Sequence, residues 1–109
     1  MAAVIDAAHL KRQAKFSLET YGPGLRTQGI IKHIKKELKE IEEEPTDIKE
    51  WIEVVILALD GAWRAGGEPQ AIIDALIAKQ SENESRTWPD WRTFSDGEAI
   101  EHIREKSNV

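Results

Sequence analysis

Residues 36–55, KELKEIEEEPTDIKEWIEVV, run from an acidic segment directly into an apolar one, with a proline between them. Before Pro45, apolar residues recur every three or four positions, which predicts a helix that Thr27 caps and Pro45 ends. After Pro45, Thr46 or Asp47 can cap the next helix, over residues 48–65. This stretch therefore predicts two helices joined by a short turn, which makes them antiparallel neighbours.

Further helices are predicted on both sides of this pair. Residues 2–18 are mostly good helix formers, and the glycines and proline of TYGPGLRT then break the pattern. Gly66 and Gly67 end the third helix, Pro69 opens a fourth through residue 86, and a short last helix is expected from about Asp96. No alternating strand pattern or internal repeat is present. The sequence predicts an all-α fold, a four-helix bundle with a short C-terminal helix, as a single domain over residues 1–109.

Composition excludes several classes of function. The 109 residues carry a net charge of −5, which argues against a nucleic-acid polymer as partner, because phosphate backbones bind basic surfaces. The chain has no cysteine, which excludes disulfides, thiolate metal sites and cysteine nucleophiles. No secretion signal or membrane span is visible, so we expect a cytoplasmic protein, with no membrane as partner.

The second predicted helix separates its two kinds of charge. At about 100° per residue, its lysines fall on the face opposite the apolar stripe. Glu37, Glu40 and Glu44 fall along one edge of that stripe instead, and His33 lies on the same edge. Some of these glutamates therefore point beside the core and not toward the solvent.

The third predicted helix is apolar over most of its circumference, more than one packing partner in a small bundle needs. We therefore expect a second interface. Its polar residues collect in one stripe: Glu50, Glu53, Asp60 and Arg64. An almost buried helix with one acidic line is typical of a metal site where carboxylates from facing helices converge.

The two ExxE pairs, Glu37 with Glu40 and Glu50 with Glu53, can each present two carboxylates on one face. Oxygen ligands without thiols favour Mg²⁺, with Mn²⁺ also possible. The alternative is an acidic face in water, balanced by nearby lysines.

The fourth predicted helix turns cationic toward its end. Lys79 and Arg86 can reach phosphate oxygens, with the Asn83 amide between them. A basic helix end that complements the helix dipole explains the same residues. Just beyond, Trp88 and Trp91 offer flat faces on which a base can stack, or they are packing residues.

Three segments, YGPGLRTQGIIKHIKKELKEIE, EWIEVVILALDGAWRAG and KQSENESRTWPDWR, carry a resemblance to a known family. With the two ExxE pairs, the sequence resembles the MazG-like all-α nucleoside triphosphate pyrophosphohydrolases, and within them the small dATP/dGTP diphosphohydrolase (MazZ-like) branch. The resemblance covers about residues 14–106.

The resemblance implies a mechanism. Two or more Mg²⁺ held by Glu37, Glu40, Glu50 and Glu53 would bind a deoxynucleoside triphosphate, and a metal-activated water would attack phosphorus to give monophosphate and pyrophosphate. Glu37 and Glu40 are the candidate bases. Lys79 and Arg86 would stabilise the phosphate charge. The branch also implies purine substrates, dATP and dGTP.

The sequence departs from the family pattern at two points. Glu53 stands where the family usually has Asp, and the spacer over residues 41–49 is short, which makes Asp60 a second candidate for the metal shell in place of Glu50. Asp60 could equally contact the nucleotide. Arg26, in the glycine-rich loop, is a candidate to meet a phosphate or a base edge.

The family resemblance implies a homodimer or homotetramer in a bacterial or phage-infected cell. Two other classes compete with the enzyme. One is a non-catalytic helical interaction module, whose acidic stripe binds a basic partner without metal. The other is an inactive nucleotide binder, which predicts binding without turnover.

Overall fold

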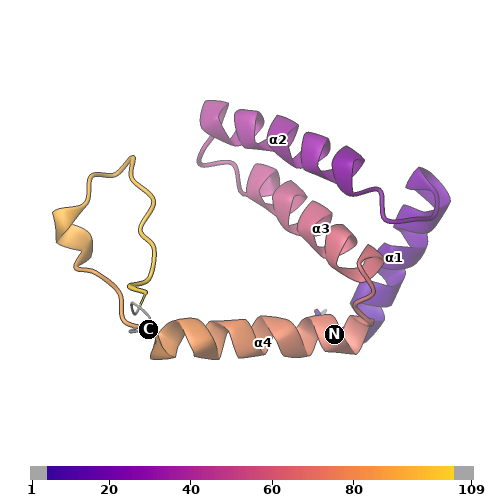
Figure 1. Ribbon diagram of the computed structural model, residues 1–109. Coiled ribbons are helices and arrows are strands. Elements are labelled where there is room, and N and C mark those ends of the chain that lie inside the picture. The colour runs from indigo at the N-terminus through magenta and orange to yellow at the C-terminus, as the bar shows by residue number, and fades with distance from the viewer. Residues whose placement is uncertain (1–4, 105–109) are drawn as a thin grey trace, which may run out of the picture. The chain divides into compact units, whose positions relative to one another are not determined.

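The computed structural model describes residues 5–104. They form four α-helices, α1 (Ala7–Tyr21), α2 (Thr27–Glu43), α3 (Ile48–Arg64) and α4 (Pro69–Ser85), and a 3₁₀ turn, η1 (Trp91–Thr93) (Figure 1). No strand occurs among these residues. The predicted all-α class and its four helices are confirmed. None of the helices described is long and apolar enough to cross a membrane.

The chain divides into two compact units, Met1–Asp74 and Ala75–Val109, and each is described by itself. The first unit contains α1, α2 and α3, and the second contains the C-terminal part of α4 and η1. That residues 1–109 form a single domain remains a prediction.

Helix α1 is displaced along the sequence from its predicted bounds. Residues 2–4 of the predicted helix lie outside the described residues. The helix begins after Asp6, whose side chain accepts a hydrogen bond from the His9 backbone N–H at 3.0 Å. It continues past residue 18 to Tyr21, because the chain first leaves helical geometry at Gly22, with φ +84°. The predicted start and end were therefore both too early.

Helix α2 begins one residue earlier than predicted. Arg26 is the N-cap, in the left-handed region at φ 50° and ψ 26°, and Thr27 is the first helical residue. The Arg26 carbonyl accepts the Ile30 backbone N–H at 3.0 Å, and the Arg26 side chain donates to the Tyr21 carbonyl at 2.9 Å. The prediction that Thr27 caps this helix was wrong, because hydrogen bonds of both the backbone and the side chain hold Arg26 in the capping position.

Two other helix starts agree with the sequence. Asp47 caps α3, accepting from the Lys49 backbone N–H at 3.0 Å, and Pro69 is the first residue of α4. Helix α2 ends at Glu43, ahead of Pro45. Both α3 and α4 end one residue before the predicted position.

The predicted C-terminal helix from Asp96 does not form in the described residues. Its N-terminal signal is present, because the Glu98 carboxylate accepts from the Ser95 backbone N–H at 2.8 Å. The following residues up to 104 are not helical, and the Ile103 N–H donates to the Thr87 carbonyl at 2.8 Å. A capping contact alone does not repay the cost of starting a short helix. Among the described residues after α4, the only helical turn is η1, which lies before Asp96.

In the first unit, α2 packs along α3, and α1 also packs against α3 (Figure 1). Each helix contributes one buried apolar residue: Leu10, Ile41 and Leu57. Three polar residues are buried as well: Ser17, Glu37 and Arg64. A buried carboxylate and a buried guanidinium in so small a core require specific partners, and these partners define the site.

Candidate active site

Three glutamates converge where α2 meets the start of α3. Glu37 and Glu40 lie one helical turn apart on α2, and Glu50 lies in the first turn of α3. One carboxylate oxygen from each residue lies within 4.8 Å of the other two. The short connection between α2 and α3 produces this arrangement, because it returns the chain beside the helix it has just left.

The environment of the cluster disfavours charge on two of its members. Burial raises the pKa of Glu37, the neighbouring carboxylates of Glu40 and Glu53 raise it further, and His33 opposes the rise. Contact with the Glu40 carboxyl raises the pKa of Glu50, followed by burial. His33 Nε2 lies 3.4 Å from a Glu37 carboxylate oxygen. Such a cluster of like charges is stabilised by a cation.

Glu53 lies beside this cluster without joining the group of three. It is exposed and lines the adjacent pocket, and its charge contributes to the raised pKa of Glu37. The structure thus brings together three of the four predicted metal ligands, with the fourth next to them. It also places Glu50, and not Asp60, with Glu37 and Glu40.

Asp60 is held by a buried arginine. Arg64 Nε lies 3.2 Å from each Asp60 carboxylate oxygen, and the Arg64 side chain is only 1% exposed. Asp60 also lines two pockets of the first unit, described below. Its carboxylate is therefore fixed in place at the wall of these pockets.

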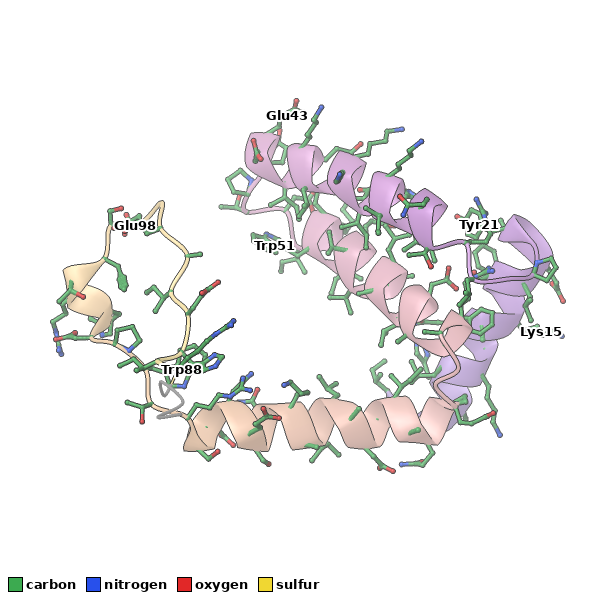
Figure 2. All side chains as sticks on the ribbon, in the orientation of Figure 1. Lys15, Tyr21, Glu43, Trp51, Trp88 and Glu98 are labelled. Atoms are coloured by element: carbon green, nitrogen blue, oxygen red, sulfur yellow. The ribbon has the colours of Figure 1, made fainter. Side chains whose placement is uncertain are left out.

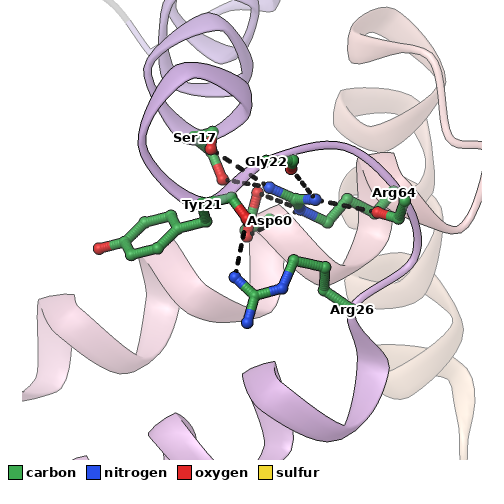
Figure 3. Close-up of polar contacts among 7 residues, drawn as sticks. Ser17, Tyr21, Gly22, Arg26, Asp60 and Arg64 are labelled. Atoms are coloured by element: carbon green, nitrogen blue, oxygen red, sulfur yellow. Dashed lines mark hydrogen bonds and ion pairs between the residues drawn. The ribbon is translucent and has the colours of Figure 1, made fainter.

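The rest of the Arg64 guanidinium organises the loop between α1 and α2 (Figure 3). Nη1 donates to the carbonyls of Gly22 at 2.8 Å and Gly24 at 2.9 Å, and Nη2 donates to the Ser17 hydroxyl at 2.9 Å. Sequence reasoning placed Arg64 in the polar stripe but missed this role. The available signal was a lone arginine in a mostly apolar helix.

Arg26, at the end of this loop, lines a small pocket. Its Nη1 donates to the Tyr21 carbonyl at 2.9 Å (Figure 3). A pocket of about 200 Å³ lies here, lined by Tyr21, Arg26, Gly29, Ile30, His33, Leu57 and Asp60. Arg26 and Asp60, both predicted substrate contacts, thus share one pocket wall.

A larger pocket of about 540 Å³ lies between α1 and α3. Its wall combines apolar and aromatic side chains with several polar ones: His9, Arg12, Gln13, Phe16, Ser17, Tyr21, His33, Glu53, Ile56, Leu57, Asp60 and Trp63. The α1 residues of this wall were not among the site residues predicted from the sequence. Their spacing of three and four positions was the signal that could have found them.

The remaining predicted site residues belong to the second unit. Lys79 Nζ lies 3.3 Å from a Glu82 carboxylate oxygen, and Arg86 pairs with the same carboxylate. These two cations lower the pKa of Glu82. The largest contribution is the hydrogen bond from Lys79, followed by the charge of Arg86. Arg86 also donates to the Asn83 side-chain carbonyl at 3.1 Å. The three predicted phosphate-binding residues therefore form one connected group at the C-terminal end of α4 and the residue that follows it.

The two predicted stacking residues differ in their surroundings. Trp88 donates its indole N–H to the Asn83 carbonyl at 2.7 Å and meets the His102 ring edge-on, with centroids 5.9 Å apart. Trp91 is 67% exposed, and the Arg92 guanidinium lies 5.1 Å from its ring centroid. Trp88 is thus anchored, and Trp91 presents most of its surface.

A protein-family model described as dATP/dGTP pyrophosphohydrolase matches residues 9–109, nearly the whole chain. The chain belongs to the dATP/dGTP pyrophosphohydrolase family. No curated protein and no solved structure matched it. Membership confirms the predicted resemblance and makes the chain a hydrolase acting on nucleoside triphosphates. A dATP/dGTP pyrophosphohydrolase must hold a triphosphate, and the glutamate cluster can bind the cation that such a substrate carries.

Proposed function

We propose that this chain is a Mg²⁺-dependent pyrophosphohydrolase that converts dATP and dGTP to the monophosphate and pyrophosphate. The observation that carries the proposal is the convergence of Glu37, Glu40 and Glu50 in a member of this family. Water supplies the attacking oxygen, the anhydride bond between the α- and β-phosphates breaks, and pyrophosphate leaves.

The donor set fits a hard divalent cation. Three carboxylates with oxygens within 4.8 Å of one another, and Glu53 beside them, offer only oxygen ligands, which suits Mg²⁺ and also Mn²⁺. When bound, such an ion neutralises phosphate charge and lowers the pKa of a coordinated water. We propose Glu37, Glu40, Glu50 and Glu53 as its ligands.

Glu37 and Glu40 are the proposed catalytic residues. One of them accepts the proton of the attacking water. The buried position of Glu37 beside Glu40 supports this assignment, because both candidate bases lie next to the proposed cation and its coordinated water. The other carboxylate keeps its negative charge and holds the cation.

Lys79, Asn83 and Arg86 are the proposed phosphate contacts. Lys79 and Arg86 pair with the same Glu82 carboxylate and Arg86 bonds the Asn83 amide, so the three side chains lie together, which supports a joint role. Arg26 and Asp60 are proposed to contact the nucleotide from the small pocket. Trp88 and Trp91 are proposed as further substrate contacts. We further propose a cytoplasmic homodimer or homotetramer, with no nucleic-acid polymer or membrane as partner.

The test incubates the purified protein with each dNTP and NTP, with Mg²⁺ or with chelator, and separates the products by ion exchange. We expect monophosphate and pyrophosphate only with the metal, formed fastest from dATP and dGTP. Glu37→Gln should abolish the reaction. Glu42→Gln, an exposed position on the same helix, is the matched control and should retain it.

Two results would replace the proposal. Metal and nucleotide binding without product would favour an inactive nucleotide binder. A folded protein with neither binding nor turnover would favour a non-catalytic interaction module, with its acidic stripe as the binding surface.

A further inference from the structure

The 540 Å³ pocket between α1 and α3 is lined by two residues that also act on the glutamate cluster. His33 lines the pocket and lies 3.4 Å from Glu37, and Glu53 lines the pocket while its charge acts on Glu37. A triphosphate held at the cluster therefore has its nucleoside end within reach of this pocket.

The pocket has the size and surface of a site for a flat heterocycle. Its volume lies in the ordinary range for small-molecule sites, roughly 300–1,000 Å³. Phe16 and Tyr21, on its wall, are 62% and 45% exposed, so their ring faces are accessible. Aromatic faces at this position favour a stacked base.

Two neighbouring side chains of α1 supply hydrogen bonds at the same wall. Among residues 5–104, the only side-chain hydrogen bond of Gln13 is to His9, with Gln13 Nε2 and His9 Nε2 2.8 Å apart. This bond uses one amide N–H and leaves the Gln13 carbonyl oxygen and the second N–H for a ligand. Within the same described range, the Arg12 guanidinium has no ion pair or hydrogen bond, and it lines the pocket.

A glutamine amide and an arginine guanidinium match different purines at the same edge. Adenine presents a donor at N6 beside an acceptor at N7, which an amide pairs with through both of its groups. Guanine presents acceptors at O6 and N7, which a guanidinium pairs with through two N–H groups. N7 is common to both purines, and pyrimidines lack it.

We propose that this pocket binds the purine base of the substrate, with Gln13 reading the N6/N7 edge of adenine and Arg12 the O6/N7 edge of guanine. The inference rests on the proposed function and assigns its base specificity to α1. Phe16 and Tyr21 supply the stacking surface. One site then accepts both purines, because Gln13 makes the base contact when adenine is bound and Arg12 makes it when guanine is bound.

The first test leaves the protein unchanged. We compare kcat/KM for dATP and dGTP with kcat/KM for 7-deaza-dATP and 7-deaza-dGTP, in which a C–H replaces N7. Losing this acceptor is expected to lower kcat/KM about tenfold for both purines. Equal values for natural and deaza substrates would overturn the N7 assignment while leaving the proposed function intact. Absence of turnover with every natural dNTP would instead contradict the proposed function.

The second test uses two variants with opposite expected selectivity. Gln13→Leu should lower kcat/KM for dATP about tenfold or more and change dGTP less than about threefold, and Arg12→Met should do the reverse. Lys11→Met, an exposed position on α1 outside the pocket wall, is the matched control and should change neither. Equal losses for both purines, or a change in oligomeric mass with unchanged selectivity, would assign the pocket to packing against a second copy and overturn the proposal.

Discussion

At the scale of single residues, the glutamate cluster that we propose as the metal site lowers the stability of the metal-free fold. Glu40 contributes to the raised pKa of both Glu37 and Glu50, so its carboxylate is the shared source of repulsion. Without a cation, three carboxylates within 4.8 Å of one another destabilise the fold. A bound cation reverses this effect, because it binds the folded chain and not the unfolded one.

The first prediction concerns Glu40→Gln. The variant should raise the melting temperature of the metal-free protein, because one like charge is removed, and it should lose most of the further rise that Mg²⁺ causes in the parent protein. Scanning calorimetry with chelator and with Mg²⁺ measures both effects. Glu42→Gln removes an exposed charge from the same helix and should leave both values unchanged. An equal Mg²⁺ effect in parent and Glu40→Gln would contradict a metal site at this cluster.

The second prediction concerns pH. The pKa of Glu37 and Glu50 is raised above 4.5 in the folded chain, so the folded state binds more protons than the unfolded state above that pH. The cluster therefore destabilises the metal-free protein increasingly as pH rises from about 4.5 through the raised values. Denaturant unfolding with chelator, run at several pH values, should give a free-energy gap between Glu40→Gln and the parent that widens as pH rises. A gap independent of pH would contradict the raised values.

At the scale of the elements, Arg64 ties three segments of the first unit together. It reaches Asp60 on its own helix, Ser17 on α1 and two carbonyls of the loop before α2. The positive φ of Gly22 and Gly24, +84° and +99°, forms the turn that supplies these carbonyls. The Arg64 side chain of α3 therefore holds the loop that carries Arg26 in position.

The third prediction is that Arg64→Met destabilises the protein by about 3 kcal/mol or more, because a nearly buried Asp60 and two carbonyls lose their partner. Urea unfolding measures the change. Arg92→Met is a closely matched control. Arg64 pairs with Asp60 and its guanidinium lies 4.9 Å from the Trp63 ring centroid. Arg92 likewise pairs with an aspartate and lies against a tryptophan, but its side chain is 71% exposed. The control should cost less than about 1 kcal/mol. Similar losses in the two variants would contradict the role assigned to burial.

Sequence predicted the elements where the deciding interaction is local. Asp47 and Pro69 act on the turn that follows them, and both helix starts were found. Helical spacing also placed Glu37 and Glu40 beside the core. The Arg64 network joins residues more than 40 positions apart, and no local pattern encodes it. The C-terminal helix failed for the same reason, because Ile103 is bonded to Thr87 and not to its own turn.

At the scale of the whole molecule, α3 exposes its apolar side. Its inward face carries Leu57 and Arg64, whereas a stripe along the helix remains exposed: Ile48 at 74%, Trp51 at 52%, Ile52 at 47% and Val55 at 50%. Trp51, labelled in Figure 2, projects from the start of α3. Contiguous apolar side chains of this kind mark an interaction surface. The second interface that the sequence predicted for this helix stays a prediction, and this exposed stripe is the face on which we propose that a second copy docks.

The last prediction is that Ile52→Glu dissociates this oligomer. Burying one such side chain stabilises a contact by about 2 kcal/mol, and a two-fold interface contains it twice, so the dissociation constant should rise roughly 1,000-fold. Light scattering after size exclusion measures the mass. Lys49→Ala changes the net charge by the same amount on the same helix and should keep the parent mass.

The activity of the dissociated variant then shows whether one chain or two supply the residues of the site. Full activity would mean that one chain holds both the glutamates and the phosphate-binding residues of α4, whereas loss of activity with retained Mg²⁺ binding would mean that α4 serves the glutamate cluster of a second copy. An unchanged mass would contradict the interface on this face of α3.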